Sequence, residues 1–183
     1  MINGLNQVIN KLNNLKKSQL IIREIFFEKT ANYIIKQAND ILVTRLDNPL
    51  NTFNSDVTNS WDIDYSDINK VVITNTYDNS ASIEFGIGIV GQMSPHNEAS
   101  SAGYVYNVAS LDKDAFGRWN FYEPNTNQFY FKYSGYKGKS FLYDSLIDYY
   151  FKNMWGRLYE EAFAEVFKKL WKELKIWILT LQV

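Results

Sequence analysis

Residues 18–46 have the sequence SQLIIREIFFEKTANYIIKQANDILVTRL, in which apolar side chains recur at helical spacing along the whole length. The apolar positions are Leu20, Ile21, Ile25, Phe26, Ile34, Ile35, Ala38, Ile41 and Leu42. Because this apolar face is wide, the segment predicts a long helix that lies across a sheet. Asp47-Asn48-Pro49 ends the helix, since proline lacks an amide donor and disfavours helical geometry at the residue before it.

The residues before this stretch predict a separate short helix. Leu5, Val8, Ile9, Leu12 and Leu15 repeat at helical spacing among Asn and Lys residues. We therefore expect helices over about 4–46, with a division near residues 16–18. The polar N-terminus predicts no signal peptide, and no apolar run approaches the ~20 residues of a membrane helix. We expect no membrane partner.

Strand-like alternation follows a predicted surface loop at 50–60 and extends over about 61–133. Residues 68–77 and 81–89 predict one antiparallel hairpin, with its turn at 78–80. Residues 118–123 and 128–133 predict a second hairpin, because Pro124-Asn125-Thr126-Asn127 supplies turn-forming residues.

The C-terminal region, about 141–181, predicts helix. A single helix over 141–179 would be about 58 Å long, roughly twice the width of a small domain, so we expect a break at Gly156. The whole chain, 1–183, then predicts one α+β domain. Its antiparallel β-sheet packs against a long N-terminal helix and a C-terminal helix, and the second hairpin is an insert.

The amino-acid composition disfavours several classes of function. The 183 residues include no Cys, which removes disulfides, thiolate metal sites and Cys nucleophiles, and only one His, which makes most metal sites and His-centred triads hard to build. The formal net charge of -1 provides no basic field for nucleic acid phosphates. We therefore expect no enzyme, no catalytic residues, no metal and no cofactor.

One motif keeps an alternative open. Residues 86–91, GIGIVG, have the spacing of a dinucleotide-binding loop, and Glu84 is a possible base beside it. That loop requires a helix at its third glycine, whereas Gln92-Met93-Ser94 predicts more loop. Glycines that bend a strand are the better interpretation. A nucleotide-binding or small-ligand enzyme remains the alternative function.

A set of features in fixed order resembles a known family. Ser82-Ile83-Glu84-Phe85-Gly86-Ile87-Gly88 looks like the YxEFGTG signature of the tail-completion, or head-tail joining, proteins of long-tailed double-stranded DNA bacteriophages. Residues 119–124 and 134–138 resemble inserts of one branch of that family, whereas Ile87 departs from the family's Thr. The matching motif positions are Glu84, Phe85, Gly86, Gly88, Pro95, His96, Gly138, Phe141 and Leu142.

The resemblance implies a structural virion protein without enzymatic activity. Such proteins form homo-oligomeric rings, six-fold or twelve-fold, at the neck or tail terminus, where they complete the tail and join it to the head. The implied partners are other copies of the chain, head-connector proteins and tail-tube proteins. DNA is only a passing, non-specific occupant of the channel. The implied location is the virion, assembled in the host cytoplasm.

Aromatic residues make up 16% of the chain and concentrate in the second hairpin and the C-terminal helix. Because Trp and Tyr dominate interface energetics, we expect these two surfaces to contact other subunits. The candidate interface residues are Trp119, Phe121, Tyr122, Phe129, Phe131, Phe163, Phe167 and Trp171. One alternative is that these aromatics form the chain's own core. Another is that the chain is a monomeric adaptor that binds a host protein.

Overall fold

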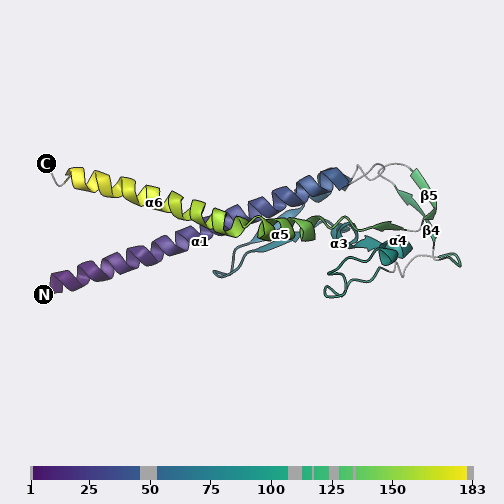
Figure 1. Cartoon of the computed structure of the whole chain (residues 1–183), viewed down its shortest axis with the longest axis horizontal. Coiled ribbons are helices and arrows are strands. Elements are labelled where there is room, and N and C mark those ends of the chain that lie inside the picture. The colour runs from purple at the N-terminus through teal and green to yellow at the C-terminus, as the bar shows by residue number, and fades with distance from the viewer. Residues whose placement is uncertain are drawn as a thin grey trace. The chain divides into compact units, whose positions relative to one another are not determined.

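The computed structural model describes residues 2–45, 53–106, 113–116, 118–123, 128–133 and 135–180. They form two compact units, and α1 (Ile2–Arg45) contributes to both (Figure 1). We call them the helical unit, Met1–Tyr33, Asp64–Val72 and Tyr149–Val183, and the mixed unit, Ile34–Ile63 and Ile73–Asp148. Among the described residues, no helix combines the length and the apolar character that crossing a bilayer requires.

The two predicted N-terminal helices are one continuous helix, α1, so the expected division near residues 16–18 is wrong. Neither Gly nor Pro interrupts residues 5–48. The Ser18 hydroxyl also donates a hydrogen bond to the Asn14 carbonyl, one turn earlier, at 2.9 Å. Serine therefore stays inside the helix by bonding back to it.

In the helical unit, α6 (Met154–Thr180) packs on α1. Ile22 of α1 and Ala162 and Val166 of α6 are buried together, with Ile25 and Phe26 packed against them. The Thr30 and Tyr149 hydroxyls lie 3.3 Å apart and share a hydrogen bond.

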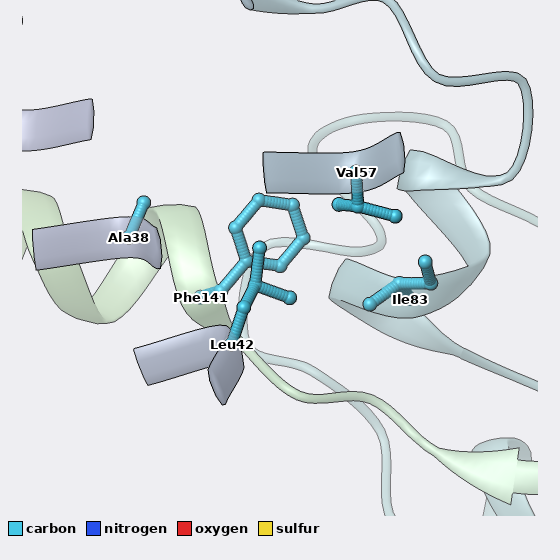
Figure 2. Close-up of a cluster of buried hydrophobic side chains, with 5 residues drawn as sticks. All are labelled: Ala38, Leu42, Val57, Ile83 and Phe141. Carbon is cyan, nitrogen blue, oxygen red and sulfur yellow. The ribbon is translucent and has the colours of Figure 1, made fainter. Parts of the chain in front are cut away.

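The core of the mixed unit joins four helices (Figure 2). They are α1, α2 (Phe53–Asn59), α3 (Ser80–Phe85) and α5 (Phe141–Phe151). The buried side chains are Ala38, Leu42, Val57, Ile83 and Phe141. The Trp61 indole N–H, beside this cluster, donates to the Asn39 side-chain oxygen at 2.9 Å.

The fold class is α+β, as predicted: the long N-terminal helix packs against the C-terminal helices, and the strands form small antiparallel sheets. Each sheet has two strands. The pairs are β1 (Trp61–Asp64) with β2 (Val72–Asn75), β3 (Gly86–Ile87) with β6 (Gly135–Lys137), and β4 (Trp119–Glu123) with β5 (Gln128–Tyr133).

The first predicted hairpin is wrong. Residues 80–85 form α3, and β2 pairs with β1 instead. Asn79 accepts the Ile83 N–H at 3.0 Å through its carbonyl, which closes a helical turn. The alternation of residues 82–85 fits either structure over so short a run, and burial of Ile83 in the core favours the helix.

The second predicted hairpin is confirmed, with Trp119 opposite Tyr133 and Tyr122 opposite Phe129. Its turn, 124–127, lies outside the described residues. The predicted loop at 50–60 contains α2 from Phe53 onward, and residues 50–52 lie outside the described part.

The C-terminal break lies at Asn153 and not at Gly156. Asn153 takes a left-handed φ of 52° between α5 and α6, whereas Gly156 lies inside α6. Asparagine tolerates this conformation better than most residues. The helix break that we expected at a glycine therefore lies at an asparagine.

Candidate functional site

The resemblance motif converges on the start of α5, in the mixed unit. Glu84, near the end of α3, is buried. Its Oε2 accepts the Leu142 N–H at 2.9 Å, and its Oε1 accepts the Tyr143 N–H at 3.0 Å. First-turn N–H groups have no partner within their own helix, and the positive end of the helix dipole favours a carboxylate there. Glu84 therefore tethers α3 to α5.

Backbone bonds reinforce this tether. The Lys139 N–H donates to the Ile83 carbonyl at 2.7 Å, and the Ser140 N–H donates to the Glu84 carbonyl at 3.1 Å. Arg45, at the end of α1, donates to the Lys139 carbonyl at 2.7 Å and also pairs with the Asp144 carboxylate. The segment before α5 is thus held from two sides.

His96 closes the other side of the Glu84 carboxylate. Its imidazole Nε2 lies 3.4 Å from Glu84 Oε1, and the two side chains are 4% and 9% exposed, respectively. The Glu98 N–H donates to His96 Nδ1 at 3.0 Å, so a neutral imidazole carries its proton on Nε2, toward Glu84. Within the described residues, Nε2 has no partner at hydrogen-bonding geometry.

Two aromatic rings enclose the imidazole. Phe85 and Tyr143 each meet His96 edge-on, with ring centroids 5.0 Å apart. The His96 backbone N–H also donates to the Tyr106 hydroxyl at 2.7 Å. Backbone and ring are both fixed, so the histidine is packed as a core residue.

Two glycines allow the backbones of this junction to meet. A Cβ on Gly138 would lie 2.3 Å from the Glu84 carbonyl oxygen. A Cβ on Gly86, whose φ is +91°, would lie 2.5 Å from the Gly138 nitrogen. Only glycine fits both positions without displacing backbone. Gly88 bridges to Gly135 in the same local sheet.

We call this arrangement the Glu84 junction, and it brings together most of the motif. Its residues are Glu84, Phe85, Gly86, His96, Gly138 and Leu142. Phe141 lies in the core, and Pro95 lines a neighbouring cavity of about 200 Å³ with His96 and Tyr143. Sequence reasoning missed Arg45 and Asp144, because no local pattern links residues so far apart.

The junction uses its carboxylate for structure. Both Glu84 oxygens accept backbone hydrogen bonds, and Glu84 is not a lining residue of the neighbouring cavity. No group of three or more His, Asp or Glu side chains that would hold a metal ion is found in the part of the chain that the structure describes.

The glycine motif forms a packed turn. A helix, α4 (Gly88–Met93), begins at the second glycine of the motif and includes Gln92 and Met93, so the expectation of more loop there is wrong. However, the Gly88 N–H donates to the Tyr106 carbonyl at 2.8 Å, and Gly91 is buried where a Cβ would lie 2.9 Å from the Gly86 carbonyl carbon. The first amide of α4 and the third glycine are therefore engaged within the chain.

The aromatics of α6 are exposed. Phe163, Phe167 and Trp171 are 48%, 55% and 55% exposed, respectively. Phe163 stacks on Phe167 with ring centroids 5.9 Å apart, and Phe167 stacks on Trp171 at 6.4 Å. The buried face of α6 is the adjacent row of Leu158, Ala162 and Val166.

Trp155 and Tyr159 continue the exposed row toward the start of α6. Trp155, Tyr159, Phe163, Phe167 and Trp171 are spaced four residues apart, and we call them the aromatic row. Trp155 and Tyr159 were not among the interface residues predicted from the sequence. Their regular spacing is the signal that identifies them, because residues four apart lie on one ridge of a helix.

The aromatic side chains of the second hairpin differ in their exposure. Trp119 is buried against Tyr133, with ring centroids 5.4 Å apart, which fits the alternative that it belongs to the chain's own packing. Phe129 is exposed. The side chains of Phe121, Tyr122 and Phe131 lie outside those that the structure describes.

Comparison with known proteins found no matching family profile, no matching curated protein and no matching solved structure.

Proposed function

We propose that this chain is a structural virion protein that assembles with copies of itself into a ring at the neck or tail terminus of a long-tailed bacteriophage. There it completes the tail and joins it to the head. The observation on which the proposal rests is the Glu84 junction, where most of the residues that resemble the tail-completion family meet as neighbours.

The use of Glu84 supports a structural role over a catalytic one. A general base must reach a substrate proton with an unoccupied oxygen. The Glu84 carboxylate instead holds the first turn of α5, and the rings of Phe85 and Tyr143 enclose the neighbouring His96. Side chains in this arrangement fix the relation between α3 and α5.

The aromatic row supports assembly. Interfaces are enriched in aromatic residues, and α6 presents five of them about half exposed. A ring subunit needs two different complementary surfaces, because a head-to-tail contact closes only by rotation. The exposed Phe129 of the second hairpin is a candidate for the other surface.

The charge of the chain suits a channel that DNA passes through. A formal net charge of -1 provides little phosphate attraction, so DNA would slide rather than bind. DNA is thus a passing occupant of the proposed ring, and the lasting partners are neighbouring head-connector and tail-tube proteins.

Particle mass and electron microscopy test this function. The purified full chain should give a mass of six or twelve subunits at micromolar concentration, and images should show closed rings. An antibody against the chain should label one end of the tail in purified virions. A chain that is strictly monomeric and absent from virions would overturn the proposal.

A matched pair of variants links the ring to the proposed surface. Phe129→Ala should weaken ring formation, whereas Val105→Ala, which removes an exposed apolar side chain of the same unit, should not. Equal effects of the two variants would exclude the hairpin as a ring contact.

A further inference from the structure

The start of α5 is capped by a residue of another helix, although its own sequence supplies a cap. Ser140 precedes the first residue of α5, and its carbonyl accepts the Asp144 N–H at 3.0 Å, so Ser140 occupies the N-cap position. Serine suits this position because its hydroxyl accepts the N–H of the second or third helical residue. Those residues are Leu142 and Tyr143, whose N–H groups Glu84 accepts instead.

The Ser140 hydroxyl is left without a hydrogen bond. Among the residues that the structure describes, none bonds to it, and Ser140 lines the cavity of about 200 Å³ beside His96. Its backbone has a φ of 48°, a left-handed conformation that costs free energy for a residue with a Cβ. An N-cap residue ordinarily has an extended backbone. Ser140 therefore has the side chain of a cap without the conformation of one.

The Glu84 junction holds Ser140 in this conformation. The Ser140 N–H donates to the Glu84 carbonyl at 3.1 Å, and the Lys139 N–H donates to the Ile83 carbonyl at 2.7 Å. The end of α3 thus restrains both residues before α5, while the Glu84 carboxylate takes the place of the serine hydroxyl. Withdrawal of α3 would end these restraints together, and it would leave two N–H groups of α5 without an acceptor.

We propose that the N-terminus of α5 is a two-state cap, with Glu84 as the cap while α3 is docked and Ser140 as the cap when α3 withdraws. In the second state Ser140 takes an extended backbone, and its hydroxyl accepts the Tyr143 N–H. Relief of the left-handed conformation and the new hydrogen bond offset part of the loss of Glu84, so the junction opens without unwinding α5. This device does not rest on the proposed place in a virion, because it involves one chain alone.

Hydrogen exchange of the full chain in a double-mutant cycle tests this coupling. In the wild type, Ser140→Ala should change exchange of the Tyr143 amide by less than about twofold, because the hydroxyl is unbonded while Glu84 is the cap. In Glu84→Ala the same change should speed this exchange about fivefold, which is the usual effect of losing a serine N-cap. Equal effects in the two backgrounds would overturn the proposal, since the hydroxyl would then act independently of Glu84.

Ser94→Ala is the matched control for this cycle. Ser94 lines the same cavity but lies at the end of α4, away from the start of α5. Its loss should leave exchange of the Tyr143 amide unchanged in both backgrounds. An effect equal to that of Ser140→Ala would mean that the cavity and not the cap controls the amide, and it would overturn the proposal.

Ser140→Gly tests the strained conformation without altering Glu84. Glycine adopts a left-handed φ at little cost, so this variant should favour the docked state and slow exchange of the Leu142 and Tyr143 amides about fivefold. Unchanged or faster exchange would overturn the proposal. This result decides even if Glu84→Ala does not fold, which far-ultraviolet circular dichroism would show.

A crystal structure of Glu84→Ala tests the second state directly. Ser140 should have a negative φ, and its Oγ should lie within about 3.2 Å of the Tyr143 nitrogen. A Ser140 that keeps its left-handed φ, with its hydroxyl unbonded, would overturn the two-state cap.

Discussion

Glu84 and Glu165 lie in opposite surroundings. The Glu84 carboxylate is buried, and both oxygens accept N–H groups of α5, whereas Glu165 is exposed and pairs with Lys169 one turn away on α6. A buried carboxylate is costly unless it is fully paired, so its neighbours are fixed. An exposed ion pair contributes little to stability.

The aromatic residues of the two regions differ in the same way. At the Glu84 junction, Phe85 and Tyr143 meet His96 within the chain. On α6, Phe163, Phe167 and Trp171 contact one another while half of their surface remains in water. Side chains of the same kind are therefore packed within the chain in one region and remain about half exposed to water in the other.

The largest expected effect separates the buried and exposed rows of α6. Leu158→Ala should lower the free energy of unfolding by about 2–5 kcal/mol, because it removes a buried side chain. Phe163→Ala removes a larger but exposed side chain and should change it by less than about 0.5 kcal/mol in dilute, monomeric protein. Urea unfolding measures both. Similar losses would mean that the aromatic row belongs to the core.

Gly138→Ala should lower the free energy of unfolding by about 1–3 kcal/mol, since the new methyl group meets the Glu84 carbonyl oxygen at 2.3 Å. Gly156→Ala is the matched control. Its Cβ meets only the Asn153 side chain at 3.4 Å, and alanine favours helix by about 0.8–1 kcal/mol over glycine. The midpoint temperature of thermal unfolding should therefore fall in Gly138→Ala and rise in Gly156→Ala. A stabilising Gly138→Ala would contradict the close backbone contact.

Glu84→Ala should lower the free energy of unfolding by about 1–3 kcal/mol, because two partly buried N–H groups lose their acceptor. Hydrogen exchange should accelerate at the Leu142 and Tyr143 amides before it does so elsewhere in α5. Glu165→Ala, the exposed counterpart, should leave exchange in α6 nearly unchanged. Protected Leu142 and Tyr143 amides in Glu84→Ala would exclude the tether.

The smallest effect concerns pH. Burial raises the pKa of the Tyr136 and Tyr149 hydroxyls above their ordinary value of 10.0. The folded chain therefore favours the neutral phenols, and the stability that this gives is fully present below about pH 10 and is lost as the pH rises further. The free energy of unfolding, measured between about pH 9 and about pH 11, should fall as the pH rises. In Tyr136→Phe this fall should be smaller. An identical profile for the variant would contradict the raised pKa of the half-buried Tyr136 hydroxyl.

The secondary structure was hardest to predict where a segment is short. The alternation of residues 82–85 fits a strand, but burial of Ile83 and the pairing of Glu84 with α5 require α3. The second hairpin was predictable because its two arms are longer and a turn sequence separates them. The C-terminal break was placed at a glycine, although Asn153 provides it.

The candidate sites were predictable to different degrees. The motif residues were identified from their order in the chain, yet no local pattern indicated that Glu84 would bond Leu142, 58 residues away. On α6, apolar spacing predicted an amphipathic helix, but it did not separate the buried row from the aromatic row. Those two rows lie one residue apart, and packing against α1 buries Ala162 and Val166 of the first row.

The sequence by itself determined which terminal segments are helical, but not where those helices divide, and it determined the second hairpin and the α+β class, because helical spacing and turn residues act over neighbouring positions. The tertiary structure decided which side chains are buried, which acid is tethered and which aromatics face water. Those outcomes depend on contacts between segments far apart in the chain. Trp119 and Trp171 are the same amino acid, but Trp119 is buried against Tyr133, whereas Trp171 is about half exposed on α6.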